Sequence, residues 1–168
     1  MNTVRCLAGT LAVVGAVGCA VASSSNTAGP LRWTGDFRMP SGYSSAVLAP
    51  GNNTPAATAY GALTLTPDAS DSAVTRADLS VTIPAATGRQ LAWAVLLGAC
   101  GSAAATVTGS NEFPLIDISS SGAGTVRTSL PFRLDEHETY HANIYNSTRS
   151  SDQGEVVMCA NLARAGHK

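Results

Sequence analysis

The fold is decided by the stretch LAWAVLLGACG at residues 91–101, which is apolar on both faces until it reaches Cys100. A second run, VVMCANL at residues 156–162, carries Cys159 in the same kind of setting. Short apolar runs rich in Val and Leu and bounded by glycine are typical of buried strands. A bond between these two cysteines would tie an early strand to the last strand of a β-sandwich.

Further segments show the same β pattern outward from these two runs. Alternation of apolar and polar residues predicts strands over 32–39, 60–66, 77–83, 91–98, 124–134, 140–146 and 155–162. Thr87-Gly88 predicts a hairpin turn, residues 50–55 a loop, and residues 101–122 a long irregular connection. Seven or eight short strands at this spacing favour an all-β fold, an antiparallel Greek-key sandwich with one disulfide.

This single domain is expected to span residues 31–163, followed by a polar tail at 164–168. Trp33 and Trp93 are expected to lie in its core or on a sheet face. Charged residues make up only 12% of the chain, against about 25% in ordinary globular proteins. The net charge is −1, and the basic residues lie singly along the chain. This distribution excludes a nucleic-acid-binding stripe.

Residues 1–22 have the pattern of an export signal. Arg5 precedes an uncharged run from Leu7 to Val21, which at 15 residues is shorter than the about 20 of a spanning helix. Two processing sites compete in this segment. Residues 20–22 suit ordinary signal cleavage, whereas residues 16–19 resemble a bacterial lipobox, at which Cys19 would be acylated. Both routes export the chain, to a secreted or periplasmic location or to a lipid-anchored place in the cell envelope.

Residues 23–30 are rich in serine and predict a flexible tether between the signal and the domain. Cys6 is lost by either route, and Cys19 is removed or lipidated, which leaves Cys100 and Cys159 in the mature domain. In an oxidising compartment two such cysteines are expected to form a disulfide. A buried pair of free thiols is the alternative.

The order of short motifs carries a resemblance to a known family. Gly-x-Cys-Gly at 98–101 is followed by Phe-Pro-Leu at 113–115, Gly-x-Gly at 122–124, Tyr-x-x-Asn-Ile at 140–144 and Cys-x-Asn-Leu at 159–162. This series resembles the copper/zinc superoxide dismutase-like sandwich and, more closely, the related CHRD-type domains of exported bacterial proteins. The resemblance implies the same sandwich and the same pairing of its two cysteines.

Relatives of this kind often carry histidines at three places where this chain has Ala94, Leu96 and Tyr145. Alkyl groups cannot ligate a metal, and a lone phenol is a poor substitute for imidazole. Dismutation needs a redox copper held by several imidazoles, and the whole chain has three histidines. The resemblance therefore implies a fold without the family's best-known activity, and we expect no cofactor.

One catalytic motif does occur, His-Glu-x-x-His at 137–141. On a helix, His137 and His141 would bind zinc and Glu138 would serve as general base. The surroundings predict instead a polar turn with two solvent-facing histidines, because strand-like alternation resumes at Tyr140. The chain is thus expected to be a non-enzymatic exported module with a structural role, or one that binds a ligand or an envelope protein. A metal-dependent enzyme, either a degenerate dismutase relative or a zinc hydrolase, is the alternative.

Overall fold

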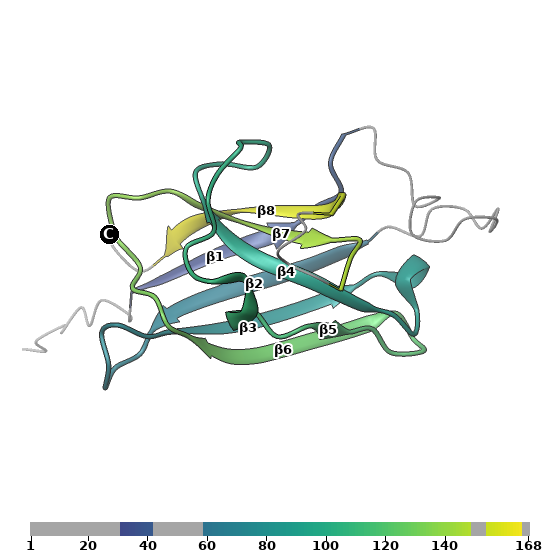
Figure 1. Cartoon of the computed structure of the whole chain (residues 1–168), viewed down its shortest axis with the longest axis horizontal. Coiled ribbons are helices and arrows are strands. Elements are labelled where there is room, and N and C mark those ends of the chain that lie inside the picture. The colour runs from purple at the N-terminus through teal and green to yellow at the C-terminus, as the bar shows by residue number, and fades with distance from the viewer. Residues whose placement is uncertain (1–30, 42–58, 149–153, 166–168) are drawn as a thin grey trace, which may run out of the picture.

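The computed structural model describes residues 31–41, 59–148 and 154–165. It contains eight strands, all paired in antiparallel fashion, and two single-turn 3-10 helices (Figure 1). The strands are β1 (Arg32–Phe37), β2 (Tyr60–Pro67), β3 (Thr75–Thr82), β4 (Gln90–Leu97), β5 (Ile116–Asp117), β6 (Ala123–Leu130), β7 (Tyr140–Tyr145) and β8 (Val156–Ala165); the helices are η2 (Pro84–Ala86) and η3 (Ser110–Glu112). The all-β fold expected from the sequence is therefore confirmed.

Several sequence-based expectations concern residues that the structure does not describe. The export signal, Cys19 and the tether, the loop at 50–55 and the last three residues lie outside the described residues. Of the residues that are described, none belongs to a helix with the length and hydrophobicity of a membrane span.

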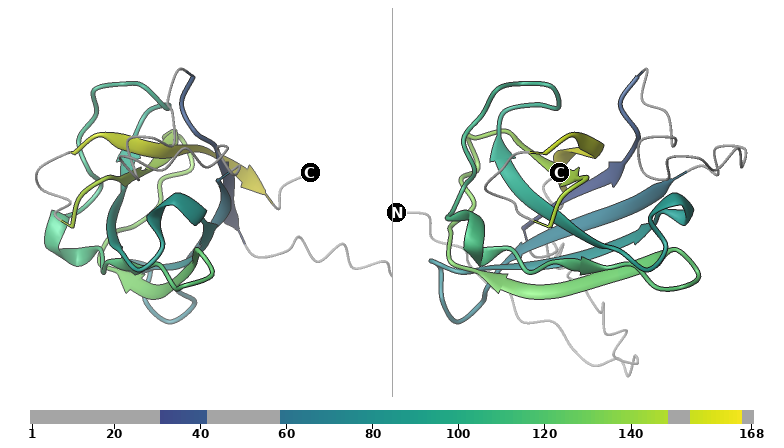
Figure 2. Two further views of the ribbon diagram at one scale, coloured as in Figure 1. Left: turned by 90° about the vertical axis from the view of Figure 1, so that its right-hand side faces the viewer. Right: turned by 45° about the vertical axis from the view of Figure 1, so that its right-hand side comes forward.

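The strands follow the order β5-β4-β7-β8-β1-β2-β3-β6 in one nearly closed sheet. One half, β1, β2, β3 and β6, faces the other half, β8, β7, β4 and β5, across a single core (Figure 2). The connections from β3 to β4 and from β6 to β7 each cross from one half to the other, so consecutive strands are not neighbours there. This is the Greek-key sandwich that the sequence predicted.

The core follows from strict alternation. Leu63 and Leu65 on β2 pair with Leu79 and Ala77 on β3, and all four side chains are buried. Trp33 and Trp93 are buried as well, and the indole N–H of Trp93 donates to the Pro114 carbonyl at 2.7 Å. Both tryptophans therefore lie in the core, as expected.

The strands differ most from the sequence-based ones in three places. The strand expected over 124–134 ends at Leu130, because Pro131 has no N–H to donate to a ladder. The connection at 101–122, expected to be irregular, contains the short strand β5, whose Ile116 pairs with Leu91. The last strand continues to Ala165, where Arg32 of β1 lies opposite. Arg164, placed by the sequence in the tail, instead forms an ion pair with Glu136 at 2.6 Å.

Glycine matters where chain segments approach closely. A Cβ on Gly124 would lie 2.7 Å from Ile116 Cγ2, so its absence lets β5 approach β6 where the sheet nearly closes. Gly88 has a φ of +72°, a left-handed conformation that glycine adopts without steric cost. A turn is therefore present at Thr87-Gly88, directly after η2. The expected hairpin is wrong, because β3 and β4 lie in opposite halves of the sandwich and do not pair.

Candidate functional site

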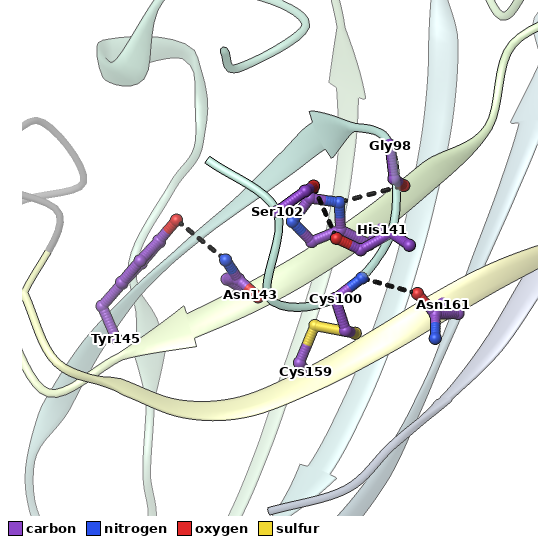
Figure 3. The surroundings of a disulfide bond; sticks show 9 residues. Gly98, Cys100, Ser102, His141, Asn143, Tyr145, Cys159 and Asn161 are labelled. Carbon is purple, nitrogen blue, oxygen red and sulfur yellow. Dashed lines mark hydrogen bonds between the residues drawn. A yellow bond between two sulfur atoms is a disulfide. The ribbon is translucent and has the colours of Figure 1, made fainter. Parts of the chain in front are cut away.

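Cys100 and Cys159 form the expected disulfide, with their Cα atoms 6.0 Å apart and a sequence separation of 59 (Figure 3). Cys100 lies in the loop that follows β4, and Cys159 lies on β8 opposite Asn143 of β7. The bond therefore fastens this loop to the outer face of the half-sandwich formed by β4, β7 and β8.

The loop turns back along β4 after the disulfide. The N–H of Leu97 donates to the Ala105 carbonyl at 3.2 Å, and the N–H of Val107 donates to the Val95 carbonyl at 3.0 Å. At its tip the Cys100 N–H donates to the side-chain oxygen of Asn161 at 2.7 Å. These bonds and the disulfide hold residues 98–107, hereafter the cover loop, against the sheet.

The outer face of β7 is buried, and the cover loop lies over its first residues. Tyr140, Ala142 and Ile144 point into the core, so His141, Asn143 and Tyr145 point outward on the alternate positions. Outward side chains of an antiparallel sheet ordinarily meet water. Here all three are buried, with exposed fractions of 0%, 8% and 2% respectively.

His141 lies directly beneath the start of the cover loop. Its Nδ1 is 3.1 Å from the Gly98 carbonyl, which only accepts, so Nδ1 carries the proton and donates. Its Nε2 is buried and has no hydrogen-bond partner among the described residues. Burial lowers the pKa of this imidazole below its usual value, because a charged ring would lose its hydration.

Asn143 and Tyr145 form the second polar contact on this face. The Asn143 amide group donates to the Tyr145 hydroxyl at 3.4 Å, and burial raises the pKa of that phenol. The carboxamide oxygen of Asn143 is buried and has no partner among the described residues. Turning the carboxamide over would bring the oxygen to the tyrosine and leave the NH₂ group unpartnered instead. In either orientation one end of Asn143 has no hydrogen-bond partner among the described residues.

Asn143 also lines a hollow of about 960 Å³ between the cover loop, β8 and the end of β1. The polar side chains of this hollow are those of Asp36, Arg38, Ser41, Ser102, Asn143, Tyr145 and Asn161. Its apolar lining includes Met39, Leu96, Ala104, Val156 and the disulfide. A concave, mostly apolar site with a few polar groups is the usual form of a small-ligand site.

The His-Glu-x-x-His motif does not form a zinc site in this arrangement. His137 and Glu138 are exposed in the turn before β7, whereas His141 is on the strand itself, so the helix that the motif requires is absent. Among the described residues no group of three His, Cys, Asp or Glu side chains lies close enough to hold a metal. The turn is confirmed, but the expectation that His141 faces solvent is wrong, because the cover loop buries it.

Ala94, Leu96 and Tyr145, the three positions singled out in the sequence, lie on this same face. Ala94 is opposite Asn143, Leu96 is opposite His141, and Tyr145 is opposite Ala92. All of them are buried. These three positions therefore present two alkyl groups and one phenol. None of the three side chains is an imidazole that could ligate a metal.

The sequence did not predict that Asn143, Asp36 and Arg38 belong to one site. Asn143 was named only as part of the Tyr-x-x-Asn-Ile motif, and Asp36 and Arg38 belong to none of the motifs. The outward alternation of His141, Asn143 and Tyr145 is visible in the sequence, as is the absence of charge from residues 98–107. Together these two features are the available signal that an apolar loop covers a polar strand face.

No protein-family model matches the sequence, and no curated protein or solved structure is significantly similar to it. The function is therefore argued from the site alone.

Proposed function

We propose that the protein is a non-enzymatic, exported binding module whose ligand occupies the hollow beside the Cys100–Cys159 disulfide. The observation that carries this proposal is the hollow itself, which has a volume of about 960 Å³ and an apolar lining that includes a few polar side chains, Asn143 and Tyr145 among them. Concave, mostly apolar sites with a few polar groups are the usual form of small-ligand sites.

The site favours binding over catalysis. The polar groups at the hollow are two carboxamides, two serine hydroxyls, a phenol whose pKa is raised by burial, an arginine and an aspartate. The Ser102 hydroxyl donates to the Ala99 carbonyl at 2.6 Å. No nucleophile paired with a base lies among these groups, and such a pair is what covalent catalysis requires. The enzymatic alternative through His137, Glu138 and His141 gains no support from the turn and strand that these residues occupy.

Export is supported by two independent features. The disulfide is of the kind that persists in oxidising compartments, and residues 1–22 have the charge and hydrophobicity of an export signal. The sandwich and its disulfide also support the resemblance to exported CHRD-type domains. We further propose that the module hangs from a membrane by a lipid on Cys19 and the tether at 23–30.

The anchor predicts the mass of the mature N-terminus. We expect the purified protein to begin at Cys19 and to carry more than one acyl chain, because a single chain binds a membrane only reversibly. Mass spectrometry of the N-terminal peptide measures this, with Cys19→Ala as the variant that should lose both the lipid and the membrane fraction. A protein that begins at Ser23 with no added mass would refute the anchor and leave export intact.

The binding proposal is tested by a fragment screen on the isotopically labelled mature domain. We expect fragments that carry a hydrogen-bond donor or acceptor to shift the amide resonances around Asn143, Cys159 and Ala104. The Asn143→Leu variant, which has the same approximate volume and no polar end, should lose these shifts and keep its fold. Shifts scattered over the surface, or none at all, would contradict a binding site in the hollow.

A further inference from the structure

The tip of the cover loop, residues 99–104, has few attachments to the sheet. Among the described residues, it is linked to other elements by the Cys100–Cys159 disulfide and by one hydrogen bond, from the Cys100 N–H to the Asn161 side chain at 2.7 Å. The hydrogen bonds of Ser102 to Ala99 stay within the tip. No side chain of the tip is fully buried. A segment with few buried contacts has low local stability, so the disulfide is the main attachment of the tip.

The tip is bound beside His141 on the outer face. Asn161, which accepts the hydrogen bond from the tip, lies directly opposite His141 on the neighbouring strand. The His141 Nδ1 lies 3.1 Å from the carbonyl of Gly98, at the base of the tip. The ring is fully buried, and its Nε2 has no partner among the described residues. Water would reach this nitrogen if the tip lifted, so hydration of the ring favours the open position.

The disulfide that opposes this opening lies beside open space. Cys100 and Cys159 are both half-buried, and both line the hollow between the cover loop and β8. Exchange requires that a thiolate reach one of the two sulfurs, so access decides whether a disulfide is reduced in the folded protein. The hollow gives a small thiol a route to this bond.

The core of the sandwich lies on the other side of the sheet from the tip. The strand β7 pairs with β4 on one side and with β8 on the other. Its core side chains, those of Tyr140, Ala142 and Ile144, point inward and are buried. Neither this pairing nor this packing uses residues 99–104. Release of the tip therefore leaves the sheet and the core in place.

We propose that the Cys100–Cys159 disulfide is a reducible latch, whose exchange with a dithiol frees the tip and exposes His141 while the sandwich stays folded. A thiolate of the dithiol attacks one sulfur, and the other cysteine leaves as a thiolate that takes a proton from water. The second thiol of the reagent then displaces the first cysteine. The dithiol is oxidised to its own disulfide, and both cysteines become thiols. The latch operates whether or not the hollow binds a ligand.

Modification of histidine by diethyl pyrocarbonate tests the latch, with the exposed His137 as a reference in the same chain. In the oxidised mature protein we expect His141 to react at least about tenfold more slowly than His137, as measured by peptide mass spectrometry. The protein is then reduced with dithiothreitol without denaturant, freed of the reagent and blocked with iodoacetamide. His141 should now react within about threefold of the rate of His137. Reoxidation of an unblocked sample should restore the protection.

Two variants separate the disulfide from the other attachment of the tip. Cys100→Ser combined with Cys159→Ser should expose His141 without reductant, and it carries no alkyl group that could prop the tip open. Asn161→Ala removes only the hydrogen bond, so it should leave His141 protected while the disulfide is intact. Exposure of His141 in oxidised Asn161→Ala would show that the disulfide is not the latch.

Circular dichroism of the same samples decides whether the opening is local. The reduced protein and the double serine variant should keep the β spectrum of the oxidised protein. Loss of that spectrum would overturn the proposal, because the sandwich would then depend on the disulfide. Continued protection of His141 in a reduced, folded protein would overturn it as well. So would a disulfide that dithiothreitol reduces only in denaturant.

Discussion

Replacing Cys159 with serine is expected to lower the free energy of unfolding by about 4 kcal/mol. The bond spans a sequence separation of 59 residues, and the chain-entropy model gives this value for a loop of that length. Small domains are stable by only about 5–15 kcal/mol in total. The variant should therefore unfold at a much lower temperature or denaturant concentration, as measured by circular dichroism.

Reduction of the disulfide in the wild type is the control for the Cys159→Ser substitution. Dithiothreitol should destabilise the wild type by about as much as the substitution does, and it should have little further effect on Cys159→Ser. Cys100→Ser should behave like Cys159→Ser, because either change breaks the same bond. The cover loop should be affected most, since Cys100 is its covalent link to β8. An unchanged melting temperature, or two free thiols in the exported protein, would contradict this account.

Most of the fold is readable from the sequence because the core obeys a simple rule. On β2 and β3 the alternate residues Leu63, Leu65, Ala77, Leu79 and Val81 are apolar and buried, so alternation alone predicts both strands and the face they turn inward. The ends of strands and the presence of short strands are less predictable, because they depend on which strand lies alongside. The two-residue β5 exists because it pairs with β4, and β8 continues to Ala165 because it pairs with β1.

The candidate site was less predictable for a physical reason. Alternation assigns His141, Asn143 and Tyr145 to the outer face of β7, and an outer face is expected to meet water. Whether it does depends on the cover loop, which reaches that face through the disulfide and through backbone bonds to β4. These are long-range contacts that no local pattern records. The sequence therefore predicted the disulfide but not the burial that it helps to create.

His141→Ala is expected to destabilise the protein by about 2–3 kcal/mol, because it removes a fully buried ring and the donor to the Gly98 carbonyl. His137→Ala is the matched control from the same motif. His137 is exposed, so its loss should change stability by no more than about 0.5 kcal/mol. Chemical denaturation of the two variants measures both values. Equal and small effects would mean that His141 is not buried beneath the cover loop.

The same residue predicts how stability depends on pH. Burial lowers the pKa of His141 in the folded state below the 6.5 of an unperturbed histidine. Between these two values the unfolded chain binds a proton that the folded chain does not, so stability falls as the pH falls through this window. Its contribution is fully present above the unfolded pKa.

His141→Asn isolates this effect. Its side-chain NH₂ retains a donor for the Gly98 carbonyl, and it does not titrate. Over the pH range below about 6.5 the wild type should lose stability relative to this variant, and the two should respond alike to pH above 7. Denaturation midpoints measured across that range in both proteins give the comparison. Parallel curves throughout would show that His141 is protonated as readily in the folded protein as in the unfolded one. The burial of this ring beneath the cover loop would then make no contribution to the pH dependence of stability.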